Sequence, residues 1–350
     1  MMCSTKFVIS LLLVSAIPIG VIVSLERAPP AGHVYHYHGV GWFRETAKWD
    51  PLNRRFLVSR FEGGVGEITL HRHRDGVLDE ITAVEDAELA GNASLGICID
   101  HPRNRLLVVE ADLITNRYSG LAAYDLSSWQ RLFLTHLAAP QVKIIVLVDI
   151  FLSSWEKLTR LNLGDEKTFA DDVAVDEKGN AYVTDAKGSK IWKVSVDGRL
   201  LSTIKSPLFT PKEWYKNLVA LNGIVYHPDG YLLVIHTFTG NLYKIHLNHK
   251  GEPEEQVKLV KLLTGSLQFG DGMELLSRTK LAVAGNPSGR LVETSDGWET
   301  ASVVAKFWGP MHRLATSATV KDGKVYLSHA IGLGYPKKKH AIIEAVFSYD

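Results

Sequence analysis

Short apolar runs alternate with turn residues along the chain, most clearly between Val173 and Ile204. This stretch reads VAVD, EKGN, AYVTDA, KGS, KIWKVSV, DG and RLLSTI. The longer runs alternate in polarity, as in strands with one buried face, and the intervening Gly, Asp and Asn favour tight turns. The pattern predicts four short antiparallel strands.

Five more units resemble this one. They contain AKWDPLNRRFLVSRFEGGVGEITL, GICIDHPRNRLLVVEAD, GIVYHPDGYLLVIHTFTGNLYKIHL, MELLSRTKLAVAGNPSGRLVETSDGWETASVV and ATVKDGKVYLSHA. Six such units predict an all-β chain, a six-bladed β-propeller over residues 33–350, with blades packed around a central channel. A pair of β-sandwiches is the alternative, although it would need no regular period. Outside the N-terminus almost no segment has the 3.6-residue apolar period of a helix.

One residue of each unit falls at a common position, just before the predicted innermost strand. These residues are Glu45, Leu95, Asp171, Asn222, Asp271 and Thr316. Successive steps are 50, 76, 51, 49 and 45 residues. The long second step indicates an insertion between blades 2 and 3 at residues 135–165. A long functional lid is the alternative, but the segment has few of the glycines that lids use as hinges.

The innermost strands of a propeller run along the channel, so residues at their entrances converge on one mouth. Glu45, Asp171, Asn222 and Asp271 would then face one another across the channel. Carboxylates that close must take up protons or bind a cation. All four offer hard oxygen ligands, which favours Ca²⁺, or another hard cation such as Mg²⁺, over zinc or copper.

Each of these residues also has an ordinary interpretation. Asn222-Gly223 and Asp271-Gly272 are common turn dipeptides, Asp171 could accept in an Asx turn, and Glu45 could be a surface charge. Their shared register favours the cation site, because the hairpin turns come several residues later. Asp172 is out of register, and we expect it to cap backbone groups or to support the ligands.

The first 28 residues differ from the rest. An uncharged run, Phe7–Leu25, precedes Glu26 and Arg27. It predicts a signal peptide or a retained signal-anchor, and hence a protein of the secretory pathway (secreted, vacuolar or in the ER lumen) with membrane anchoring through this segment as one outcome. The sequon at Asn92 agrees with such a location. Cys3 and Cys98 are the only cysteines, and Cys3 precedes the apolar run, so a disulfide between them is not expected.

Charge gives no indication of a polyanionic partner. Lys and Arg total 39 against 38 Asp and Glu, for a formal net charge of +1. We therefore expect no nucleic-acid binding. The small-molecule substrate that we expect follows from the hydrolase activity inferred below.

The motifs carry a family resemblance. ETAKWDPLNRRFLV resembles the Glu-Gly-Pro-x-Trp opening of the senescence-marker-protein/gluconolactonase/luciferin-regenerating-enzyme-like family, of the calcium-dependent phosphotriesterase superfamily. LNGIVYHPDGYLLV and FGDGMELL resemble its Asn-Gly-[Leu/Ile] and Asp-Gly-Met motifs. The resemblance covers residues 40–350 without the insertion.

This resemblance implies a six-bladed propeller with one catalytic divalent metal, commonly Ca²⁺, and hydrolysis of lactones or organophosphate esters. The family's Glu, two Asn and Asp ligands map onto Glu45, Asp171, Asn222 and Asp271. Asp171 departs from the family pattern, since an extra carboxylate binds a cation more tightly but weakens it as a Lewis acid. Phe169-Ala170 stands where some lactonases have an arginine, which makes sugar-acid lactones poor candidates.

We therefore expect a metal-dependent hydrolase of a lactone, ester or phosphotriester, with Asp271 as general base or nucleophile. His236 and His312 are candidate proton shuttles, although ordinary core or loop histidines are the favoured interpretation. A non-catalytic binding propeller with a structural ion is the alternative. A strictosidine-synthase-like enzyme is another, because such propellers and paraoxonase-like ones have a similar signal-bearing plan.

Overall fold

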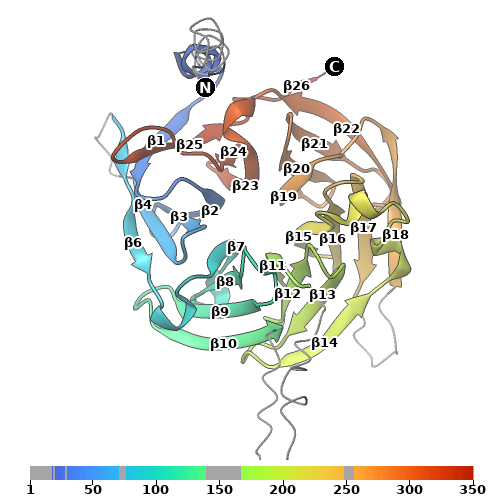
Figure 1. Ribbon diagram of the computed structural model, residues 1–350. Helices are drawn as coiled ribbons and strands as arrows, with labels where there is room; N and C mark the ends of the chain where they lie inside the picture. Colours follow the sequence, from blue (N-terminus) through green and yellow to red (C-terminus); the bar gives the residue numbers. More distant parts are fainter. Residues whose placement is uncertain are drawn as a thin grey trace, which may run out of the picture.

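The chain forms a ring of six blades around a central channel (Figure 1). The structure, a computed structural model, describes residues 18, 20–27, 30–70, 76–138, 167–247 and 256–349. The predicted all-β propeller is therefore confirmed, with strands as its dominant element and short 3₁₀ turns between them. These turns are η1 (Ala87–Leu89), η2 (His101–Arg103), η4 (Pro207–Phe209), η5 (Trp214–Asn217) and η6 (Met311–Arg313).

Blades 1 to 3 are antiparallel four-stranded sheets in which successive strands lie progressively farther from the channel. Blade 1 contains β2 (Arg44–Asp50), β3 (Arg55–Arg60), β4 (Val65–Thr69) and β6 (Ile81–Val84). Blade 2 contains β7 (Ala93–Asp100), β8 (Arg105–Ala111), β9 (Ser119–Asp125) and β10 (Arg131–Ala138). Blade 3 contains β11 (Ala170–Val175), β12 (Ala181–Asp185), β13 (Lys190–Val194) and β14 (Leu200–Lys205).

Blades 4 and 5 are joined at their outer edges, where β18 pairs with β22 in parallel. Blade 4 contains β15 (Leu221–His227), β16 (Tyr231–His236), β17 (Asn241–His246) and β18 (Gln256–Thr264). Blade 5 contains β19 (Gly270–Ser277), β20 (Lys280–Gly285), β21 (Gly289–Glu293) and β22 (Thr300–Phe307), with β26 (Ser348–Tyr349) beside β22.

Blade 6 combines both ends of the chain. Its inner three strands are β23 (Ala315–Lys321), β24 (Lys324–His329) and β25 (Lys338–Glu344). The fourth strand is β1 (Val34–Gly39), which pairs antiparallel with β25 from Val34 opposite Ile343 to Gly39 opposite Lys338. A short strand, β5 (Leu78–Asp79), runs parallel to β1. Closing the last blade with the first strand locks the ring, because no blade is left with an open seam.

The hydrophobic core lies between blades rather than in one central mass. Tyr182 and Ile191 of blade 3, for example, pack with Leu232 and Val234 of blade 4. Each sheet therefore buries both faces, which explains why the strands carry apolar residues on both sides apart from their ends.

The two segments that interrupt the repeat in the sequence fall mainly outside the described residues. Residues 20–27 of the predicted signal or anchor are helical, and most of that segment is not described. The predicted insertion at 135–165 begins inside β10, which extends to Ala138, and its remainder is not described. Among the described helices, none has the length and hydrophobicity needed to cross a bilayer.

Candidate functional site

Every inner strand contains a β-bulge near its start. There, pairing with the second strand of the blade breaks register and leaves residues unpaired. The unpaired residues are Glu45 and Thr46, Leu95 and Gly96, Asp171 and Asp172, Asn222 and Gly223, Asp271 and Gly272, and Thr316. The register inferred from the sequence is thus present, but its residues lie inside the strands and not before them.

The bulges give the Asn-Gly and Asp-Gly pairs a function other than turning the chain. Gly223 lies within β15, and a Cβ atom there would be 2.3 Å from the carbonyl oxygen of Asp271. A Cβ at Gly272 would be 2.7 Å from the carbonyl oxygen of Thr316. Glycine is therefore needed so that neighbouring inner strands can approach closely. The turn interpretation of these pairs is wrong.

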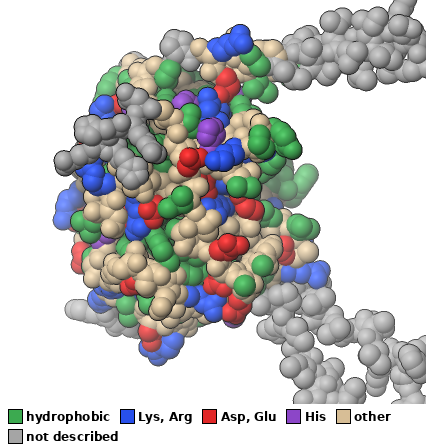
Figure 2. Space-filling view, turned by 90° about the vertical axis from the view of Figure 1, so that its left-hand side faces the viewer, with side chains coloured by type: hydrophobic (Ala, Val, Ile, Leu, Met, Phe, Trp, Pro, Cys, Tyr) green, Lys and Arg blue, Asp and Glu red, His purple; other side chains and the backbone are tan. Residues whose placement is uncertain are grey.

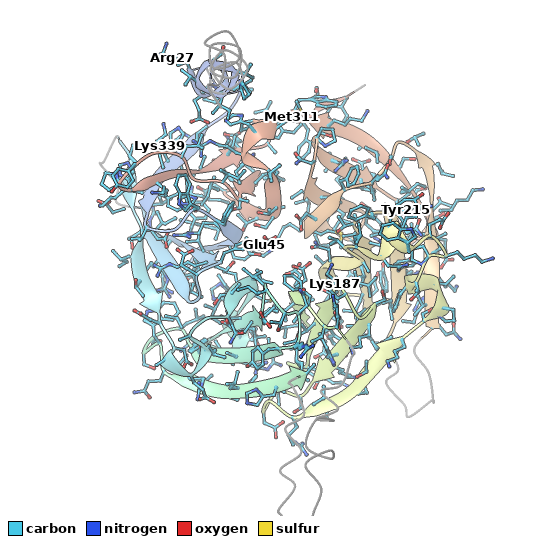
Figure 3. All side chains as sticks on the ribbon, in the orientation of Figure 1. Arg27, Glu45, Lys187, Tyr215, Met311 and Lys339 are labelled. Carbon is cyan, nitrogen blue, oxygen red and sulfur yellow. The ribbon has the colours of Figure 1, made fainter. Side chains whose placement is uncertain are left out.

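The bulges bring four polar residues to the channel mouth. We call Glu45, Asp171, Asn222 and Asp271 the mouth ring; Figure 3 shows Glu45 at the edge of the central opening. Asp171 is only 6% exposed and Asn222 only 7%. Burial raises the pKa of Glu45 well above its usual range, and the charges of Asp271 and Asp171 raise it further. Burial and the charge of Asp271 do the same for the pKa of Asp171. Burial and mutual repulsion therefore disfavour the simultaneous ionisation of all three carboxylates in the mouth ring.

Asp271 has an unsatisfied oxygen. The Asn222 side chain and the Gly272 backbone N–H donate hydrogen bonds to its carboxylate, yet burial, with the charge of Asp172, still raises its pKa to about 7. Its Oδ1 is buried and has no hydrogen-bond partner among the described residues. A buried carboxylate oxygen without a partner is costly, so a cation or a bound hydroxyl would stabilise it.

The oxygen donors of the mouth ring suit a hard cation, but they are not arranged as a complete coordination site. Its donors are carboxylate and amide oxygens, which suit Ca²⁺ or Mg²⁺. Within the described residues, however, no group of three or more His, Cys, Asp or Glu side chains is arranged to hold a metal ion. The three carboxylates would thus have to move together to share one ion, which their mutual repulsion opposes when no cation is present.

Asp172 points to the neighbouring blade. Its Oδ2 accepts a hydrogen bond from the backbone N–H of Ile224 at 3.2 Å, and its Oδ1 accepts one from Val173 at 2.8 Å. Ser317, one residue after the bulge position of blade 6, makes a similar contact with blade 1. Its hydroxyl oxygen accepts a hydrogen bond from the backbone N–H of Ala47 at 3.0 Å. The expected capping role of Asp172 is therefore observed.

A half-buried ion pair lies one step below the mouth ring. Lys48, three residues after Glu45, donates from Nζ to Glu274 at 2.6 Å and to the carbonyl of Ala318 at 3.1 Å. Burial opposes its charge, but Glu274 and Asp172 outweigh burial and raise the pKa of the Lys48 ammonium. Sequence analysis missed this pair. The signal in the sequence was that Lys48 follows the predicted ligand Glu45 by three residues, as Glu274 follows Asp271.

Leu95 and Thr316 occupy the bulge position in blades 2 and 6, but neither adds an uncommitted polar group to the channel mouth. Leu95 is buried and packs with Phe61 and Phe169, so the mouth is apolar beside blade 2. Thr316 donates its hydroxyl to the backbone carbonyl of Glu45 at 2.6 Å. The polar part of the mouth therefore belongs to blades 1, 3, 4 and 5.

The two candidate histidines lie in different environments. His236 pairs with Leu221 beside Asn222, its Nε2 is buried with no partner among the described residues, and burial lowers its pKa to about 4. It is therefore neutral at pH 7. His312 bonds Glu26 at 2.7 Å in the N-terminal segment. No described contact links either residue to the ring carboxylates.

Two pockets lined by described residues lie away from the ring. One, of about 670 Å³, is formed between blades 1 and 2 and is lined by Arg44, Arg60, Glu80 and Glu110 among others. The other, of about 320 Å³, lies between the N-terminal segment and blades 5 and 6. Neither includes a mouth-ring residue.

Solved structures with the same fold cover almost the whole chain. The Malassezia sympodialis allergen Mala s 1 is 15% identical with a TM-score of 0.61, over 89% of this chain and 96% of that one. A protein provisionally assigned as a gluconolactonase is 15% identical, with a TM-score of 0.52 over 90% and 93%. A luciferin-regenerating enzyme is 11% identical, with a TM-score of 0.53 over 91% and 98%.

These likenesses establish the propeller fold. No protein-family model and no curated protein sequence matches the chain.

Proposed function

We propose that the chain is a divalent-cation-dependent hydrolase of a lactone, an ester or a phosphotriester, with the mouth ring as its reactive centre. The observation that carries this proposal is the buried Oδ1 of Asp271, which has no partner among the described residues. The names of two proteins with the same fold, a gluconolactonase and a luciferin-regenerating enzyme, agree with it.

Glu45, Asp171, Asn222 and Asp271 would hold the ion, with Ca²⁺ preferred because it tolerates irregular oxygen geometry. When bound, the cation would polarise the substrate carbonyl or phosphoryl oxygen and stabilise the charge that develops there. The donor set suits that ion, and the raised pKa values of Glu45 and Asp171 are what a cation would reverse.

The side chains around the ion would divide the remaining work. Oδ1 of Asp271 would accept a proton from the attacking water, a role suited to a buried carboxylate oxygen that has no partner among the described residues. The apolar wall of Leu95, Phe61 and Phe169 would receive the non-polar part of the substrate. Lys48 and Glu274 would fix the channel below the ring without contacting the substrate.

The test is hydrolysis of a panel of lactones, aryl esters and phosphotriesters with and without calcium, with metal content measured on the same sample. We expect activity that chelation removes and calcium restores, and an Asp271→Asn protein that folds but does not turn over. Glu177→Gln, an exposed acidic site at the far end of blade 3, is the matched control. Full turnover by Asp271→Asn, or a sample that binds no metal and hydrolyses no substrate even after calcium is added, would refute the proposal.

A binding propeller with a structural ion is the second candidate. The low exposure of Asp171 and Asn222 favours it, because an ion held there would have little contact with solvent. In that case calcium would raise the melting temperature while the whole substrate panel remained unreacted.

A further inference from the structure

The end of the propeller that carries the mouth ring also carries large exposed apolar side chains. Connections from the fourth strand of one blade to the first of the next, and from second to third strands, all lie at the end where inner strands begin. We call this end the mouth face. Large exposed apolar residues in these connections include Trp42 (51%), Ile114 (88%), Trp214 (76%), Trp308 (61%) and Tyr335 (91%). Monomeric proteins seldom expose so many large apolar groups at one end without a use for them.

These side chains are distributed around a rim rather than gathered in a groove. Trp42 precedes blade 1, Ile114 belongs to blade 2, Trp214 precedes blade 4, and Trp308 and Tyr335 belong to the blade 5–6 connection and blade 6. Figure 3 shows Met311, close to Trp308, above the central opening and Tyr215, beside Trp214, to the right of it. In side view, hydrophobic side chains project at the right-hand edge of the molecule (Figure 2). A rim of this kind suits a flat partner better than a peptide.

The chemistry of the rim is that of a membrane interface. Trp and Tyr are enriched where proteins meet lipid headgroups, since their rings are apolar at one end and polar at the other. The Lys338 ammonium lies 4.2 Å from the Trp42 ring centre and 5.2 Å from that of Tyr335, which supports both rings at the surface. Lys187 between β12 and β13, Lys339 at the start of β25 and Arg27 of the N-terminal segment, all labelled in Figure 3, lie at the same end of the propeller, where they could contact phosphate groups.

The N-terminal segment meets this same face. Glu26 bonds Arg313 of η6 through two contacts of 2.6 Å, and this holds the pKa of the glutamate down at about 2. Val21, Val23 and Leu25 on the preceding turns are each more than 40% exposed. They end the uncharged run that starts at Phe7 in the sequence. Figure 1 shows this helix almost end-on beside the rim, so its axis lies near the channel direction.

We propose that the mouth face docks flat on a phospholipid bilayer, with Trp42, Trp214, Trp308 and Tyr335 at the headgroup level. A helix that leaves this face along the channel direction would enter the same bilayer. The proposal is independent of the hydrolase activity, because it rests on exposed side chains outside the ring.

The test uses the full chain bound to phosphatidylcholine vesicles whose acyl chains carry bromine, which quenches nearby tryptophan fluorescence. We expect quenching that persists at high salt and that is removed when Trp42→Phe, Trp214→Phe and Trp308→Phe are combined. Trp129→Phe, at the opposite end of blade 2, should leave that quenching in place. The additional pair Ile114→Asp and Tyr335→Asp should lower quenching at least about twofold, because charge opposes burial at the interface. Leu52→Asp should not, since Leu52 is 75% exposed in the turn between β2 and β3.

Three outcomes would overturn the proposal. Protein that co-sediments with vesicles but shows no quenching assigned to Trp214 or Trp308 would be anchored with its mouth face away from lipid. Quenching that disappears at high salt would mean that charge, and not apolar contact, holds the protein. Absence of quenching together with a change of solution mass on Ile114→Asp would assign the rim to contact between copies.

Discussion

The carboxylate of Asp172 accepts the backbone N–H of Ile224 at 3.2 Å and so connects inner strands β11 and β15 across two blades. Its neighbour Asp171 instead belongs to the mouth ring. Two adjacent aspartates thus have separate tasks because the bulge turns them in different directions.

Asp172→Ala should therefore destabilise the fold without removing a proposed ligand. Two N–H groups lose their acceptor and Lys48 loses a nearby negative charge, which should cost about 1–3 kcal/mol of unfolding free energy. Urea denaturation measures this change. Asp172→Asn keeps an acceptor oxygen and should lose less; equal loss in both variants would contradict the capping role.

Stability without divalent cations should fall as the pH rises. Burial raises the pKa of Asp271 to about 7 and that of Asp172 to about 6, whereas unfolded aspartates titrate near ~4. Between these values the folded chain binds more protons than the unfolded chain, so stability is greatest below about pH 4 for these groups and is lost as the pH rises through about 7.

Urea denaturation in the presence of a chelator across this range measures the slope. Asp271→Asn should flatten part of it, by about 1–4 kcal/mol over the window. A chelated protein that becomes more stable between about pH 4 and 7 would show that the ring is not a source of repulsion.

Calcium should stabilise the folded protein by occupying the ring. A ligand at one hundred times its dissociation constant adds about 2.7 kcal/mol, which thermal unfolding detects easily. Glu45→Gln should abolish most of this gain, because it removes one of the predicted ligands, whereas Glu177→Gln should preserve it. The same gain in Glu45→Gln as in the unaltered protein would place any bound ion elsewhere.

Gly223→Ala should disturb the ring through the backbone. The added Cβ would approach the Asp271 carbonyl to 2.3 Å, so β15 and β19 would have to separate, at about 1–3 kcal/mol. Gly289→Ala is the matched control, since its nearest neighbour is the flexible end of Leu327 at 2.8 Å. If the two variants lose equal stability, close strand approach is not what Gly223 provides.

Tyr37→Ala tests how β1 closes the ring of six blades. Tyr37 of β1 is fully buried and stacks on His340 with ring centres 5.2 Å apart. Its loss should lower the unfolding free energy by ~3–5 kcal/mol, the usual range for a large buried aromatic residue. Tyr335→Ala, 91% exposed, should change it by less than about 0.5 kcal/mol. A mild effect of Tyr37→Ala would mean that β1 is not needed to hold blade 6.

The blade pattern and the common register could be predicted because both repeat along the chain. Short apolar strands alternate with turn residues in each unit, and the residue at the bulge recurs at steps of 45 to 51 positions except across the insertion. The bulges could not be predicted in this way, because one additional residue in a strand does not alter the local composition of the sequence. Asp171 and Asp172 were therefore expected before the strand and not within it.

Contacts between distant strands were the least predictable part. Lys48 and Glu274 are separated by 226 positions and by the intervening inner strand β23, so their pairing depends on ring closure. The same holds for Ser317 and Ala47 across the seam between blades 6 and 1. Local patterns carry no information about which blades become neighbours.

The pairing of β1 with β25 also has a consequence for synthesis. Val34 and its partner Ile343 are 309 positions apart, so a ribosome adding ~5–20 residues each second would complete β25 roughly 15–60 s after β1 has formed. Throughout that interval the edge of β1 that pairs with β25 has no partner strand, while the five preceding blades can already fold. The final blade is thus assembled by an early segment and a late one, and the ring can close only after β25 has been made.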